Sequence, residues 1–133
     1  MRDIKYIVIH CTATKPNTNK EAILNYWKNT LKWKSVGYHR LIDANGVIHE
    51  LAKYEQITNG VKGYNSESIH FSYIGGIDES GRPKDTRTIK QKESLLYLIK
   101  NSIILLSVFK SSIIDSTYCF SLLCSTICSR WFS

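Results

Sequence analysis

The hydrophobic pattern of the chain begins with an unbroken run at residues 6–9, which are β-branched or aromatic at every step. Such a run fits a strand covered on both faces better than a strand that alternates between core and solvent. It ends at His10 and then breaks into small and hydroxyl residues. The pattern predicts a buried strand with a histidine at its carboxyl end, where open α/β sheets usually hold ligands and metals. From this stretch alone, His10 can be a metal ligand or proton carrier, or it can bond a backbone carbonyl.

Further strands are predicted downstream. Residues 37–43 and 47–51 flank an Asn-Gly pair at 45–46, which is among the strongest sequence signals for a β-hairpin. Residues 68–74 form another strand-like run that ends in two glycines. Together these stretches predict a sheet with at least one antiparallel pair.

Three other histidines fall within these predicted strands. Because side chains alternate along a strand, Tyr38 and His39 are predicted to point to opposite faces and not to line one cleft. We expect His39 and His49 to pack or to form local hydrogen bonds, and we do not assign His70 as a metal ligand.

Two capping boxes predict helices. Thr18 with Glu21 opens the first helix, and Thr88 with Gln91 opens a second, longer helix over residues 89–106. Apolar side chains recur at helical spacing in both, which predicts core-facing stripes. The stripe of the first helix consists of Ile23, Leu24, Trp27 and Leu31. Leu95, Leu98, Ile99 and Leu106 are among the apolar positions of the second.

The composition indicates one domain. A chain of 133 residues can bury roughly two thirds of its unfolded surface. The formal charge of +7 favours an anionic partner, for which nucleic acid, membrane surfaces and bacterial wall polymers all qualify. The lysines are scattered and are not clustered with stacking aromatics, so we expect no nucleic-acid partner. No signal peptide or transmembrane segment is predicted, so we expect a protein made in the cytoplasm.

The last part of the chain differs from the rest. Residues 111–133 contain only two charged side chains and are dominated by serine, cysteine and large apolar residues, without glycine or proline. This composition fits neither a solvated tail nor an amphipathic element. Three of the four cysteines crowd into this segment, so their distribution does not indicate a disulfide framework. They are Cys119, Cys124 and Cys128.

Four stretches in the same chain resemble a known family. They are residues 7–14 (IVIHCTAT), 37–42 (GYHRLI), 60–66 (GVKGYNS) and 68–78, which begins SIH and ends GGID. In order and spacing they resemble the zinc-dependent N-acetylmuramoyl-L-alanine amidases of type 2, the bacteriophage-lysozyme-like class related to peptidoglycan recognition proteins. The resemblance covers about residues 4–106. It implies an α/β fold with a mixed central sheet flanked by helices.

The resemblance also implies a site and a substrate. Members hydrolyse the amide between N-acetylmuramic acid and L-alanine in peptidoglycan, as lysins that act on the cell wall. His10 matches the first zinc ligand, and Tyr38 matches the tyrosine that assists catalysis. Asn59 and Asn65 lie in loops where this fold would meet a sugar or peptide, although loop asparagines also stabilise turns. We expect one zinc ion, peptidoglycan as the partner, and a monomer.

The chain departs from the family after residue 106. The family places a second histidine and then a cysteine or aspartate late in the sequence, but no histidine follows His70 and no proline follows Pro83. A catalytic zinc needs three protein ligands. We therefore divide the chain into an incomplete amidase-like domain at 1–106 and an atypical tail at 107–133, and we hypothesise that the tail is read out of frame. Replacement ligation by the late cysteines and a non-catalytic peptidoglycan-binding module are the alternatives.

Overall fold

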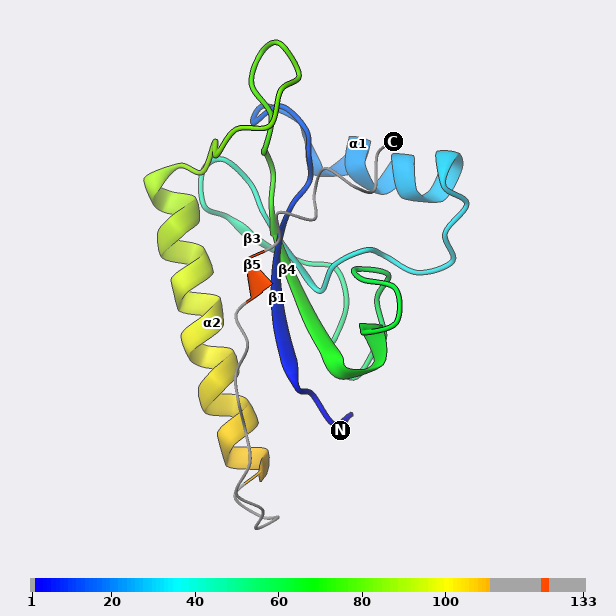
Figure 1. The fold of residues 1–133 in the computed structure, drawn as a ribbon, viewed down its shortest axis with the longest axis vertical. Helices are drawn as coiled ribbons and strands as arrows, with labels where there is room; N and C mark the ends of the chain where they lie inside the picture. The colour runs from blue at the N-terminus through cyan, green and yellow to red at the C-terminus, as the bar shows by residue number, and fades with distance from the viewer. Residues whose placement is uncertain (1, 111–122, 125–133) are drawn as a thin grey trace.

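The computed structural model describes residues 2–110 and 123–124 and contains a mixed five-stranded sheet with helices on both faces (Figure 1). The strand order is β3-β2-β4-β1-β5, with β2, β4, β1 and β5 parallel and β3 antiparallel to β2. The strands are β1 (Tyr6–Cys11), β2 (Arg40–Ile42), β3 (Ile48–Glu50), β4 (Ser68–Tyr73) and β5 (Leu123–Cys124). The predicted α/β class with a mixed, helix-flanked sheet is therefore confirmed.

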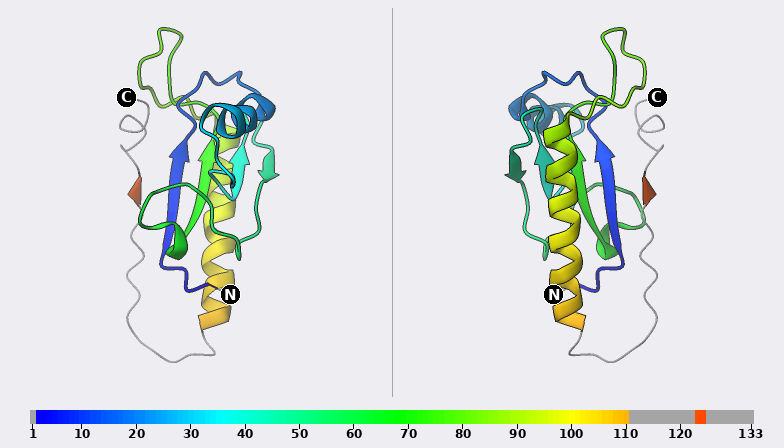
Figure 2. Two further views of the ribbon diagram at one scale, coloured as in Figure 1. Left: turned by 90° about the vertical axis from the view of Figure 1, so that its right-hand side faces the viewer. Right: turned by 90° about the vertical axis from the view of Figure 1, so that its left-hand side faces the viewer.

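One face of the sheet packs against the long helix α2 (Ile89–Lys110). In Figure 2, α2 passes in front of the strands in one view and behind them in the other. Alternate residues of β1 and β4 point to this helix, including Ile7, Ile69 and Phe71, and they meet Leu95 and Leu98 of α2 in the main core cluster. The intervening residues of both strands therefore face the other side of the sheet.

The opposite face is covered near the carboxyl ends of the strands by α1 (Lys20–Asn25), which continues into the π-helical turn η1 (Tyr26–Thr30). Ile23 and Trp27 from these helices pack on Leu41 and Ile74. The predicted capping residue of this helix was wrong by one position. Asn19 is the N-cap, and its side-chain oxygen accepts a hydrogen bond of 2.8 Å from the Ala22 amide.

The predicted stripe of the first helix is also corrected at one end. Ile23 and Trp27 are buried and Leu24 is half-buried, as expected, but Leu31 is exposed. The helix widens to π-type spacing at Tyr26, so a residue four positions beyond Trp27 no longer lies on the same face. The Trp27 ring, on the first turn of this segment, packs edge-on against Tyr38 at 5.2 Å between ring centroids.

The remaining elements were predicted closely. The Asn-Gly hairpin joins β2 to β3, although each strand has only three residues. In α2, Leu95, Leu98 and Leu106 are buried, and the helix continues four residues beyond its predicted end.

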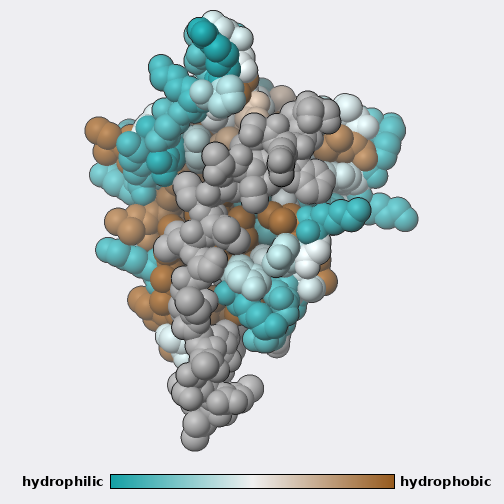
Figure 3. Space-filling model, in the orientation of Figure 1, coloured by the Kyte–Doolittle hydropathy of each residue, from teal (hydrophilic) through white to brown (hydrophobic). Residues whose placement is uncertain are grey.

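Other apolar side chains of α2, such as Leu96, Tyr97 and Ile104, are exposed, and Figure 3 shows apolar residues along this side of the molecule. No helix in the described part of the chain combines the length and apolar character that crossing a membrane needs.

The second capping box is present as predicted. The Thr88 amide donates to the Gln91 side chain at 3.0 Å, and the Gln91 amide donates to the Thr88 hydroxyl at 3.1 Å. We expect Thr88→Ala to lower the free energy of unfolding by about 1 kcal/mol, because an N-terminal amide of α2 loses its acceptor. Urea denaturation measures this loss. Thr18→Ala is the matched control and should be nearly silent, since Asn19 caps α1; equal losses in both variants would contradict the assignment.

Candidate functional site

Four aromatic rings form a continuous row on the face of the sheet opposite α2. The His10 ring lies between Tyr38 and His70, with ring centroids 4.9 Å and 5.1 Å away, and His70 in turn stacks on His39 at 6.0 Å. His10 comes from β1 and His70 from β4, and the parallel pairing of these strands brings them together. His10 Nε2 and His70 Nδ1 are 3.0 Å apart.

This row corrects the prediction that Tyr38 and His39 point to opposite faces, but the two do not line one cleft, as predicted, because only Tyr38 borders the groove beside the first helix. Strand β2 begins only at Arg40, so the alternation rule does not apply to the two preceding residues. Tyr38 contacts His10, and His39 contacts His70, on the same face of the sheet. The expectation that His39 and His49 pack or bond locally is confirmed, since His39 packs on His70 and His49 Nε2 lies 3.0 Å from an Asp43 carboxylate oxygen.

His39, at one end of this row, is fully buried, and both of its ring nitrogens form hydrogen bonds. Its Nδ1 accepts a hydrogen bond of 3.0 Å from the His70 amide, so the proton of the neutral ring is on Nε2. That Nε2 donates to the Gln56 carbonyl at 2.9 Å. The backbone amide of His39 also donates to the His70 carbonyl. These two hydrogen bonds fix His39 and His70 beside each other, at the end of the row away from Tyr38.

Burial keeps the three histidines neutral. It lowers the pKa of His10 to about 4. Burial, with a smaller effect from Arg2 and Arg40, lowers the pKa of His39 to about 4. For His70, burial is again the main cause, and the neighbouring histidines and Arg2 add to it, so its pKa falls to about 3. At neutral pH each ring therefore carries one N–H and one lone pair.

The loop at Gly60 fits closely around the His70 ring. A Cβ at Gly60 would lie 2.4 Å from His70 Cγ and Nδ1, so only glycine leaves room for the imidazole. The sequence did not predict this contact or the position of His70 beside His10, because both depend on the pairing of distant strands.

We expect Gly60→Ala to destabilise the fold by ~1–3 kcal/mol or more through overpacking against a buried ring. Chemical denaturation measures the change. Gly63→Ala serves as the control: it has open space for a Cβ but a φ of +88°, so it should show only the backbone strain of ~1–2 kcal/mol. A Gly60 variant that is more stable than the Gly63 variant would argue against this packing.

A groove of about 330 Å³ opens beside Tyr38, between β1 and the first helix. Its walls combine hydroxyl groups with aromatic and aliphatic side chains. They are Thr12, Thr14, Thr18, Ala22, Ile23, Tyr26, Trp27 and Tyr38. The Thr12 hydroxyl accepts from the Gly75 amide at 3.0 Å and lies 2.7 Å from the Thr14 hydroxyl. Tyr38 thus connects the groove to His10.

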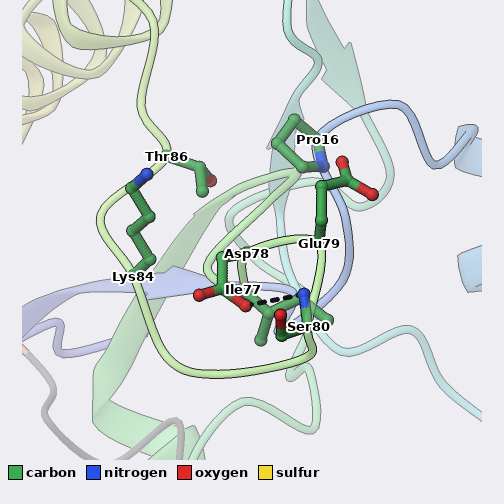
Figure 4. A pocket seen from close by; sticks show the side chains of 7 residues that line it. All are labelled: Pro16, Ile77, Asp78, Glu79, Ser80, Lys84 and Thr86. Carbon is green, nitrogen blue, oxygen red and sulfur yellow. Dashed lines mark hydrogen bonds between the residues drawn. The ribbon is translucent and has the colours of Figure 1, made fainter.

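A second hollow of about 370 Å³ lies among the loops that follow β1 and β4 (Figure 4). Its Asp78 carboxylate accepts hydrogen bonds from the Ser80 and Arg82 amides and so shapes its own loop. Glu79 pairs with Lys15. Since both carboxylates are already engaged and no ring of the histidine row borders this hollow, the groove beside Tyr38 is the candidate site.

The two asparagines proposed as substrate contacts are engaged in loop structure. The Asn59 side chain donates to the Ser35 carbonyl at 3.1 Å, and the Asn65 side chain accepts from the Val61 amide at 2.7 Å. Neither lies among the residues that line the groove. A contact with substrate remains a prediction for both.

The described residues do not contain a complete set of metal ligands. No group of three histidine, cysteine or acidic side chains comes together within residues 2–110 and 123–124. Strand β5 pairs Cys124 with Ile9, the neighbour of His10. Cys119 and Cys128 lie outside the described residues, so replacement ligation by these cysteines stays a hypothesis.

Residues 1–106 match the family described as N-acetylmuramoyl-L-alanine amidase. The endolysin of Escherichia phage T7 is 34% identical over 94 residues, covering 70% of this chain and 62% of the endolysin. The endolysin of Klebsiella phage KP32 is 31% identical over 99 residues, covering 74% and 66%.

The fold is similar to the crystal structure of PGRP-SA from Apis mellifera. The TM-score is 0.66 with 26% sequence identity, and the match covers 79% of this chain and 65% of PGRP-SA. The chain therefore spans less than two thirds of the length of each of these three proteins.

Proposed function

The chain belongs to the N-acetylmuramoyl-L-alanine amidase family, and we propose that it hydrolyses the amide between N-acetylmuramic acid and L-alanine in peptidoglycan. One observation carries the proposal: His10 and Tyr38, which match the family's site, contact each other at the end of the groove. In this proposal the chain acts as a monomer on the cell wall, after being made in the cytoplasm. The surplus of positive charge suits anionic wall polymers.

The groove offers the chemistry that such a substrate requires. Tyr26 and Trp27 provide apolar surface for a sugar ring or a stem peptide, and the threonine hydroxyls can bond its polar groups. The Tyr38 phenol can donate a hydrogen bond to the oxyanion that forms when the amide carbonyl is attacked. Asn59 and Asn65 remain proposed contacts at the outer loops.

Zinc is the proposed cofactor, with His10 as its first ligand. The donor chemistry fits at His10, whose Nδ1 forms no hydrogen bond with another described residue. The other two ligands that a catalytic zinc needs are absent from the described residues, so they do not make a full zinc site. We therefore assign no step of the hydrolysis to the metal.

The incomplete ligand set favours a second candidate, a peptidoglycan-binding module without hydrolysis. One experiment separates the two. Purified full-length chain is incubated with purified sacculi and zinc, and newly exposed L-alanine amino groups and sedimented protein are both measured. An amidase exposes amino groups in proportion to time. A binding module sediments with the sacculi and exposes none, and a chain that does neither contradicts both candidates.

We also propose that residues 107–133 are read out of frame. The family match ends at residue 106, and the composition changes at about the same place. Translation of the other two frames of the coding DNA beyond this codon tests the idea. We expect one frame to encode a late histidine followed by a Cys-Pro segment; if neither frame does, the proposal is wrong.

A further inference from the structure

The outer side of α2 carries an exposed apolar patch. Leu96, Tyr97, Ile103 and Ile104 are 53%, 62%, 36% and 61% exposed. At about 100° per residue they form two neighbouring rows on the side of the helix opposite its buried leucines. In the right-hand view of Figure 2, α2 lies in front of the sheet, and no other described helix or strand covers it. A helix that is apolar on every side is normally buried on every side, so we expect a partner to cover this patch.

A lysine lies in the middle of the patch. Lys100 is one turn after Leu96 and one turn before Ile104, and it is exposed. It forms no ion pair with any described residue. The whole of α2 contains four lysines and a single acidic residue, Glu93. The four apolar residues and Lys100 form the outer patch, and its partner must therefore offer both apolar contact and negative charge.

Two kinds of partner meet only part of this requirement. A second copy of the chain in a symmetric dimer would place the same patch on both sides of the interface, so each Lys100 would lie near its own copy. The charge of +7 on each chain opposes such a dimer further. Anionic wall polymers supply negative charge but little apolar surface. An anionic lipid surface supplies both, and helices with apolar residues, lysines and an aromatic ring lie in the plane of such a surface.

We propose that the outer patch binds the surface of a bilayer that contains anionic phospholipid. The four apolar side chains enter the boundary between headgroups and acyl chains, while the long Lys100 side chain reaches back to the phosphates. The contact is peripheral, because no helix in the described part of the chain is long and apolar enough to cross a membrane. The histidine row and the groove lie on the opposite face of the sheet, so a chain bound in this way keeps its groove open to substrate.

Sedimentation of the full-length chain with vesicles tests this contact. One set of vesicles contains equal parts of phosphatidylglycerol and phosphatidylcholine, and the other contains phosphatidylcholine alone. We expect wild type to bind the anionic vesicles more strongly. The double variant Leu96→Ser with Ile104→Ser should lower the partition coefficient about tenfold or more, because two apolar side chains no longer enter the bilayer. Lys100→Gln should lower it about fivefold on anionic vesicles only.

The matched control is the double variant Val47→Ser with Ile57→Ser. These side chains are 51% and 52% exposed and lie outside α2, so their loss should leave binding unchanged. Circular dichroism checks that each variant is folded. Serine forms helices about as well as isoleucine, so we expect the α2 variant to fold; if it does not, Lys100→Gln decides.

Wild type that does not bind anionic vesicles, or that binds both kinds of vesicle equally, would overturn the proposal. Unchanged binding by the α2 variant would do the same, since another segment would then carry the contact. Sedimentation velocity without vesicles gives the remaining outcome: a wild-type dimer that becomes monomeric in the α2 variant would assign the patch to a second copy. The vesicles contain no peptidoglycan, so a failure of the proposed amidase activity would appear only in the sacculus assay, where the α2 variant should match wild type.

Discussion

Replacing Tyr38 with phenylalanine should lower the rate of amide hydrolysis by ~10²–10³-fold, because the site loses a donor to the developing oxyanion. The ring itself would remain, so its packing against His10 and Trp27 should persist. Peptidoglycan binding should therefore change little. Initial rates of stem-peptide release, measured together with sedimentation on sacculi, give the two quantities.

Tyr26→Phe is the matched control for this experiment. Tyr26 lines the same groove, whereas Tyr38 is the groove residue whose ring packs against His10 at 4.9 Å. We expect Tyr26→Phe to keep most of the hydrolytic rate. Equal losses of hydrolytic rate in the two variants would contradict a catalytic role that is specific to Tyr38.

Lowering the pH from neutral to about 4 should strongly destabilise the fold. His39 has its pKa lowered to about 4, whereas an unfolded histidine has a pKa near 6.5. Between these pH values the unfolded chain binds more protons than the folded chain. The contribution of neutral His39 to the free energy of unfolding is therefore fully present above pH ~6.5 and is lost as the pH falls towards the folded pKa. His39 alone should lower the free energy of unfolding by about 3 kcal/mol by pH 4, because each pKa unit corresponds to ~1.4 kcal/mol.

His10 and His70 act in the same direction, since burial lowers the pKa of both. Arg2 and Arg40 add to the effect at His39 by opposing its protonation. Urea denaturation at a series of pH values measures the free energy of unfolding. We expect a plateau above pH ~7 and a steep decline below pH ~6.5. A free energy that stays constant down to pH 4 would show that these rings are not buried as the structure places them.

Local patterns were sufficient to predict most of the framework. The apolar runs gave β1 and β4, the Asn-Gly pair gave the hairpin, and Thr88 with Gln91 gave the start of α2. These signals depend on neighbouring residues only. The error at Leu31 arose because the helix changes to π-helical spacing after Asn25, and a search for a period of 3.6 residues does not detect such a change.

The site was predicted only in part for a related reason. His10 and Tyr38 were identified through a family resemblance, but His70 was not recognised as their neighbour. Its position depends on the parallel pairing of β1 with β4 across 60 positions of sequence. Tyr38 and His39 were assigned to opposite faces because the predicted strand started three residues too early. The parallel pairing, once assumed, would have placed His10 and His70 on one face.

In the proposed function, this chain is an amidase that uses His10. Its most direct test is mass spectrometry of a soluble muramoyl-peptide after incubation with the full-length chain and zinc, with His10→Ala in parallel. We expect wild type to split the bond between the lactyl group and L-alanine and His10→Ala to leave it intact. An intact substrate with wild type, or equal cleavage by both proteins, would contradict it.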